Sequence, residues 1–151
     1  MTSNPVKHAR GVELLLKVGN GASPEVYTAF CSINAARGIS FTSSLNEFNI
    51  PDCTDPDLIA WVAREKASLS IAVTGAGILN TPDVDDFFNW FKSETSKSCQ
   101  IVVDVTAALG GQVFTGDFHL SEFSITGNRG GKMECSLSLA SDGEVVMTTN
   151  T

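Results

Sequence analysis

The strongest constraint on the fold is a strict alternation of apolar and polar residues on both sides of a turn, within positions 123–145. Phe123 and Ile125 precede a glycine-rich turn at 127–131, and every second residue after the turn is apolar again up to Leu139. A period of two is typical of a β-strand with one buried and one polar face, and glycine and asparagine tolerate the backbone angles of tight turns. The stretch therefore predicts a long β-hairpin.

The rest of the chain also favours β-structure. The apolar phase slips between Leu120 and Phe123, which predicts a bulge or a bend in a long strand. We expect a mainly β fold, a small sandwich or barrel of about seven or eight antiparallel strands with one flanking α-helix. The further predicted strands cover residues 11–19, 26–33, 38–42, 67–75, 98–106 and 112–125.

The one predicted helix covers residues 81–94. Thr81 can cap it, Pro82 suits its first position, and three aspartates follow in its first turn. Apolar residues then recur at the spacing of a helix that packs on a sheet. These helix-to-sheet packing residues are Val84, Phe87, Phe88 and Phe91.

Size and charge limit the possible functions. The 151 residues suit one domain, residues 1–151, and the formal net charge of −7 disfavours a protein that binds nucleic acid by neutralising phosphates. Only 18% of the residues are charged, which is compatible with surface buried against other copies. No run of eighteen apolar residues and no signal peptide is present, so we expect a cytosolic chain without membrane insertion.

Residues 43–64 are predicted to form a long irregular loop, because prolines, acidic residues and large apolar residues are mixed there. A loop this long is usually functional, and its apolar content favours docking on a partner. Its aspartates are spaced as in a calcium loop, but Pro51 and Pro56 intrude and the closing glutamate is missing, so no metal site is predicted. The candidate contact residues are Leu45, Phe48, Ile50, Asp52, Asp55, Asp57 and Trp61.

No catalytic residue and no cofactor is predicted. His8 and His119 are the only histidines, and no G-x-S-x-G motif exists. The glycine-rich segments at 75–77 and 127–132 do not open a helix, as a phosphate loop does. The cysteines lack a C-x-x-C pair and are expected to be buried free thiols. They are Cys31, Cys53, Cys99 and Cys135.

Acidic residues recur at the polar positions of the predicted strands, among them Asp104, Glu122 and Glu134. They form either a solvated sheet face or the wall of an electronegative passage. The periodicity of the sequence is compatible with both interpretations.

Four phrases in a fixed order carry a resemblance to a known family. They are "NIPDCTDPD", "WVAREKASLSIAVTGAGIL", "DVDDFFNWF" and "GGQVFTGDFHLSEFSITGNRGGKMECSLSLASDGEV". With them the chain resembles the major tail tube proteins of non-contractile phage tails, and most closely those of phage-like gene transfer agents. The resemblance implies a non-enzymatic structural subunit with the tail-tube fold, whose hexameric rings stack into an electronegative conduit for double-stranded DNA.

The resemblance also implies how the parts of the chain are used. Residues 1–10 become an N-terminal arm, 43–64 an inter-ring loop and 146–151 a C-terminal tail, while Asp104, Glu122 and Glu134 are expected to line the lumen. The implied partners are other copies, a tail terminator, distal tail or baseplate proteins, a tape measure protein in the lumen, and DNA that passes without specific binding. The subunit would assemble in the cytoplasm of the producing bacterium and end in the tail of the released particle.

Three alternatives remain at this point. The first is a monomeric β-sandwich that binds carbohydrate or a receptor through Trp61 or Trp90. The second is a small barrel enzyme that uses His119. The third is the tube of a contractile tail or secretion system.

Overall fold

The computed structural model of the chain describes residues 3–21, 25–29 and 32–150. The described residues form strands, one α-helix and two short 3-10 turns at Gly11–Glu13 and Ala107–Leu109. The predicted strand at 26–33 lies partly outside the described residues, as does Cys31. In chain order the elements are β1 (Leu14–Gly19), β2 (Tyr27–Thr28), β3 (Ala36–Ile50), β4 (Trp61–Ile78), α1 (Asp83–Lys92), β5 (Lys97–Val103), β6 (Gln112–Thr126), β7 (Glu134–Ser141) and β8 (Val146–Thr149).

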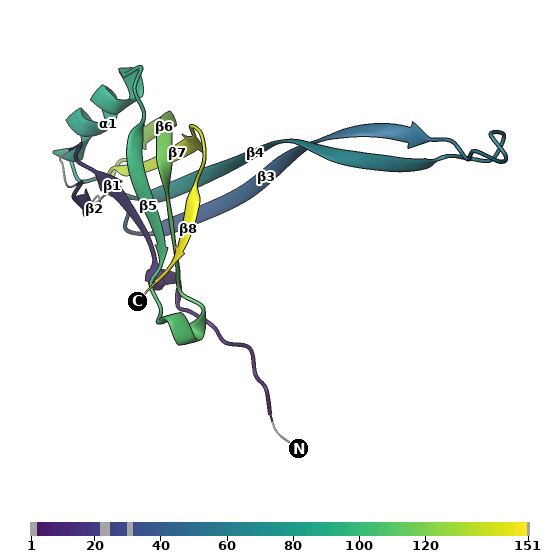
Figure 1. The fold of residues 1–151 in the computed structure, drawn as a ribbon. Helices are drawn as coiled ribbons and strands as arrows, with labels where there is room; N and C mark the ends of the chain where they lie inside the picture. The colour runs from purple at the N-terminus through teal and green to yellow at the C-terminus, as the bar shows by residue number, and fades with distance from the viewer. Residues whose placement is uncertain (1–2, 22–24, 30–31, 151) are drawn as a thin grey trace.

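All the strands belong to one antiparallel sheet. Its order is β2-β1-β5-β6-β7-β4-β3, and β8 also pairs with β6. Residues 112–118 of β6 pair with β5 and β8, and residues 118–126 pair with β7, with a register shift between Leu120 and Glu122. The predicted bulge is confirmed, and at this bulge the long strand passes from one half of the bent sheet to the other (Figure 1). The predicted mainly β fold with a flanking helix is also confirmed.

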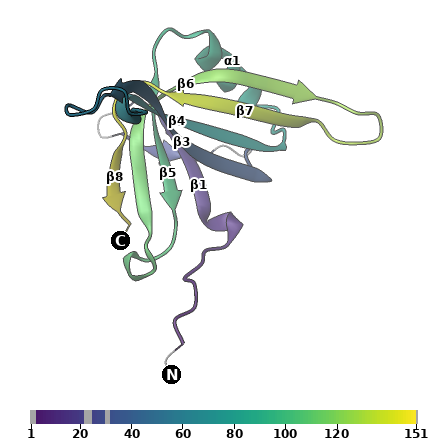
Figure 2. The ribbon, with the colours of Figure 1, turned by 90° about the vertical axis from the view of Figure 1, so that its right-hand side faces the viewer.

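The core lies between the two halves of the sheet and α1. The ring of Phe87 on α1 packs against Phe123 of β6, with centroids 4.9 Å apart. Figure 2 shows α1 above β6 and β7. The other core residues come mainly from β1, β4, β5, β6 and β7, and include Leu16, Val18, Val73, Ile101, Phe118, Leu137 and Leu139.

The predicted packing stripe of α1 needs a correction. Phe87 and Trp90 are buried and Val84 is half-buried, but Phe88 and Phe91 are about half exposed, so the prediction is wrong for these two. The helix contacts the sheet along positions three apart, and Phe88 and Phe91 lie outside that line. The helix also begins at Asp83, and no side chain caps its first turn.

Residues 43–64 do not form an irregular loop. β3 and β4 pair from Ala36 to Ile50, with a bulge between Ser44 and Leu45, so only residues 51–60 connect two strands. β4 pairs with β7 only from Ala72 to Ile78. Residues 43–69 are therefore a two-stranded ribbon, here called the arm, which projects far from the rest of the molecule (Figure 1).

The two ends of the chain also differ from the prediction. The predicted polar tail at 146–151 contains a strand, because β8 pairs with the first residues of β6. The predicted first strand starts three residues late, since Gly11–Glu13 is a 3-10 turn whose Glu13 carboxylate accepts the N–H of Arg10 at 3.1 Å. Residues 3–10 have no regular secondary structure.

Candidate functional site

A four-strand section of the sheet has one covered face and one open face. It consists of residues 36–42 of β3, residues 70–78 of β4, β7 and residues 119–126 of β6, paired in that order. Phe123, Leu137 and Val73 point toward α1 and the core. Because side chains alternate along a strand, the residues between them point to the opposite side, which nothing in the described chain covers. We call this side the open face.

Short side chains fill the open face in rows that cross all four strands. Neighbours in each row are direct cross-strand partners and so share a face. Within one row the hydroxyls of Ser124 and Ser136 are hydrogen-bonded at 2.6 Å. The rows are Ala36-Ala76-Ser136-Ser124, Gly38-Thr74-Ser138-Glu122 and Ser40-Ala72-Ala140-His119.

The charged residues of the open face are acidic. Glu122 lies in the second row, and Glu134 lies beside Thr126 at the end of the section; both are exposed. No lysine or arginine occupies these rows. Asp104, the third predicted wall residue, follows β5, which is not part of the section, so the structure brings together only two of the three.

Both edges of the section lack a strand partner among the described residues. β3 pairs with β4 alone, and residues 119–126 of β6 pair with β7 alone. The backbone groups along such edges are ready to pair with another strand. The section is thus a sheet fragment with an unpaired edge on each side.

The arm exposes apolar side chains on both of its faces. Leu45 and Val62 lie on one face, and Phe48, Ile50 and Trp61 lie on the other. Ile59 and Trp61 are 96% and 87% exposed. An isolated two-stranded ribbon is marginally stable in water, and exposed apolar surface of this kind marks a contact site.

Asp52 organises the tip of the arm. Its Oδ1 accepts the Thr54 hydroxyl at 2.7 Å and the backbone N–H groups of Thr54 and Asp55 at 2.8 and 3.2 Å. The Thr54 side-chain hydrogen bond, followed by the two backbone hydrogen bonds, lowers the pKa of the Asp52 carboxyl. In the described residues no group of acidic, histidine or cysteine side chains is arranged to hold a metal ion.

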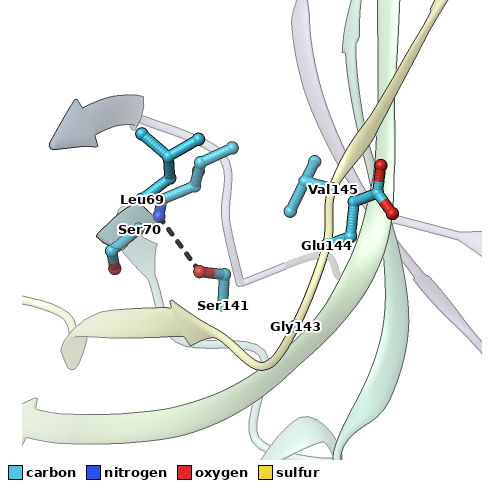
Figure 3. Close-up of a pocket in the computed structure, with 7 residues that line it drawn as sticks. Leu69, Ser70, Ser141, Gly143, Glu144 and Val145 are labelled. Atoms are coloured by element: carbon cyan, nitrogen blue, oxygen red, sulfur yellow. Dashed lines mark hydrogen bonds between the residues drawn. The ribbon is translucent and has the colours of Figure 1, made fainter. Parts of the chain in front are cut away.

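A cleft of about 610 Å³ lies at the base of the arm, on the side opposite to the open face. Leu69, Ile71 and Val145 form its apolar wall, and the backbone N–H of Ile71 donates to the Ser141 hydroxyl at 3.0 Å (Figure 3). Its only carboxylate, Glu144, points away from Leu69 and Ser141 (Figure 3). The lining holds no base beside a hydroxyl, so it offers no acid-base pair for catalysis.

His119 belongs to a surface pair. Its Nε2 lies 3.1 Å from Oδ2 of Asp142, and about half of each side chain is exposed. The pair links β6 to the turn that follows β7. No helix in the described residues is long and apolar enough to cross a membrane.

Sequence reasoning missed the rows of short residues, although their signal is visible. In the stretch from Ala67 to Gly75 every second residue is alanine, serine or threonine, and the residues between them are the apolar Leu69, Ile71 and Val73. When one face of a strand carries only short residues, the sequence predicts a sheet surface from which no long side chains project.

The comparisons with known proteins agree with this geometry. A family model described as phage tail tube protein matches residues 8–147. The protein is thus a structural protein, of the class of subunits from which phage-type tails are built. The chain belongs to the phage tail tube protein family.

Solved structures with the same fold come from several particles. The tail of an empty gene transfer agent particle, refined with C6 symmetry, has a chain with a TM-score of 0.70 and 20% identity, over 94% of this chain and 100% of that one. The tail tube of SPP1 gives a TM-score of 0.59 at 11% identity, over 93% and 79%. The tube-terminating cap of the anti-feeding prophage gives 0.59 at 10% identity, over 99% and 95%. No curated protein sequence matches the chain.

Proposed function

We propose that six copies of this chain form a ring in which β3 of each copy pairs with β6 of the next, and that the rings stack into a hollow tube. One observation carries this: the four-strand section has two unpaired edges, and its strands alternate in direction. A copy rotated about the tube axis therefore presents β6 antiparallel to β3. Closing the ring pairs both edges of the section, which removes their exposed backbone groups.

The open face lines the bore in this arrangement, and double-stranded DNA passes through it. Alanine, serine and threonine keep the wall shallow, and Glu122 and Glu134 are its repelling charges. Repulsion between charges in solution decays over about 8 Å at physiological salt, so these carboxylates act on DNA only near the wall. Asp104 lies outside this wall.

The remaining partners follow from the proposed tube. A tape measure protein occupies the bore during assembly, and terminator and baseplate proteins close the two ends. The fold similarity to the cap of the anti-feeding prophage and to a chain of its baseplate supports end proteins that share the subunit's fold. Assembly takes place in the cytoplasm of the producing bacterium, and the tube then forms the tail of the particle.

Paired cysteines test the ring. Ser124→Cys on β6 is combined in turn with Ser40→Cys, Thr42→Cys or Ser44→Cys on β3, in a background that carries Cys31→Ser and Cys53→Ser. Within one copy β3 and β6 are three strand spacings apart, about 14 Å, which is too far for a disulfide. Oxidation of the assembled protein should therefore link neighbouring copies, and a denaturing gel without reductant should show a ladder that ends at six chains.

Each variant with only one of the introduced cysteines is the matched control, because one accessible cysteine per chain can join two chains at most. Electron microscopy of the same samples should show hollow tubes with sixfold symmetry. The ring proposal is wrong if assembled protein gives no ladder with any of the three pairs, or if the ladder stops at another number.

One alternative is favoured by a specific residue. Trp90 is only 2% exposed and offers no stacking surface, but Trp61 is open on the arm, as a carbohydrate- or receptor-binding module would require. Sedimentation separates the two functions, since a binding module stays at 16.0 kDa at every concentration.

A further inference from the structure

The two ends of the four-strand section are different surfaces. The loop between β6 and β7, residues 127–133, lies at the end where Thr126 pairs with Glu134 and Glu134 with Ile78. β3 and β4 leave the section at its other end and continue into the arm. When identical rings stack head to tail, the loop end of one ring meets the arm end of the next.

The tip of the arm, residues 51–60, holds an apolar cleft with an acidic margin. The cleft has a volume of about 430 Å³, and its apolar lining includes Ile50, Leu58, Ile59 and Trp61. Asp52 is part of the lining, and Asp55 and Asp57 follow in the same loop. These three aspartates are the only charged residues of the tip.

The loop 127–133 has the complementary character. Arg129 and Lys132 are its only charged residues and both are exposed, and Met133 beside them is 53% exposed. Gly130 has a φ of +87°, and the N–H of Gly131 donates to the carbonyl of Asn128 at 3.0 Å. This tight turn makes the loop a narrow projection at the end of the hairpin (Figure 2).

We propose that the arm-tip cleft of one copy receives the loop 127–133 of a copy in the adjacent ring, with Met133 against the apolar lining and Arg129 and Lys132 beside the aspartates. This inference rests on the proposed tube. The charged residues of the tip are all negative and those of the loop are all positive, and both surfaces also expose apolar residues. This complementarity favours the loop as the occupant over DNA or an unrelated acidic protein. Single exposed ion pairs are weak, but each inter-ring interface repeats the contact around the ring.

A charge exchange tests the contact. One variant carries Arg129→Glu and Lys132→Glu, a second carries Asp55→Lys and Asp57→Lys, and a third carries all four changes. Asp52 is left in place because it holds the turn of the tip. Each double reversal places like charges together and should shorten the tubes about tenfold, whereas the fourfold variant should restore the length of the unmodified tube.

Glu94→Lys, an exposed reversal in the loop between α1 and β5, is the control and should leave tube length unchanged. Circular dichroism checks that each variant folds. If none of the cysteine-pair variants gives a ladder and the unmodified protein forms no tubes, the proposed function fails. If it forms tubes but either double reversal leaves their length unchanged, or the fourfold variant is no longer than the double ones, the inter-ring contact is wrong and the ring proposal stands.

Discussion

Burial divides the described cysteines into two chemical groups. Cys99 and Cys135 are buried, but Cys53 is exposed at the arm tip, so the prediction of a buried thiol is wrong for Cys53. Burial raises the pKa of the Cys99 thiol to about 12, although the nearby charge of Lys97 lowers it in part. Burial also raises the pKa of Cys135. Because the thiolate is the reactive form, the two buried cysteines should be inert in the folded subunit.

Alkylation at pH 8 checks this difference. A thiol with a pKa of about 12 is ionised in roughly one molecule in ten thousand at that pH, and burial also blocks the reagent. Iodoacetamide should therefore label Cys53 within minutes and leave Cys99 and Cys135 unlabelled until denaturant is added. Mass spectrometry of the peptides gives the result, and labelling of Cys99 at the rate of Cys53 would show that Cys99 is not buried.

At the scale of single elements, α1 shows how much of the packing of a helix can be predicted from the spacing of its apolar residues. Spacing alone correctly places an apolar stripe on the helix but does not determine which of two adjacent lines of residues faces the sheet. The positions of β5 and β6 decide it: the Lys97 ammonium lies 5.5 Å from the centre of the Trp90 ring, and Phe87 meets Phe123. Phe88 and Phe91 are left on the outer flank, where the Lys92 ammonium lies 5.3 Å from the centre of the Phe88 ring.

Two phenylalanine truncations on this helix should therefore differ strongly. Phe87→Ala removes a side chain with no exposed surface and should lower the free energy of unfolding by about 3–5 kcal/mol. Phe91→Ala, on the half-exposed flank, should cost less than about 1 kcal/mol in the isolated subunit. Urea denaturation at concentrations below assembly measures both, and equal losses would mean that the buried line of the helix is misplaced.

The arm shows why one element could not be read from the sequence. A strand is recognised when one face is apolar and the other polar, but the arm has apolar residues on both faces and a bulge that reverses the phase at Ser44. The pattern fits a ribbon that has no core of its own. What the sequence does show is the surplus of apolar residues, which correctly indicates surface that the single chain leaves uncovered.

At the scale of the whole molecule, the sheet topology determines which acidic residues can act together. Alternation in the sequence shows that Asp104, Glu122 and Glu134 all occupy polar positions, but it does not show which polar positions share a face. Their placement depends on the pairing of β6 with β7 and on the bulge after Leu120, which are contacts between distant parts of the chain. The structure leaves Glu122 and Glu134 on the open face and Asp104 outside it.

Charge reversal on the open face tests its role in transport. Tubes that carry Glu122→Lys and Glu134→Lys should reach normal length, because both side chains lie on the open face and the changes leave the backbone groups that pair β6 with β3 intact. Their bore would attract phosphates in place of repelling them, and DNA delivery by the assembled particles should fall about tenfold. Asp104→Lys introduces the same kind of change outside the section and should leave delivery unchanged. Normal delivery through correctly assembled double-mutant tubes would show that the open face does not contact the path of the DNA.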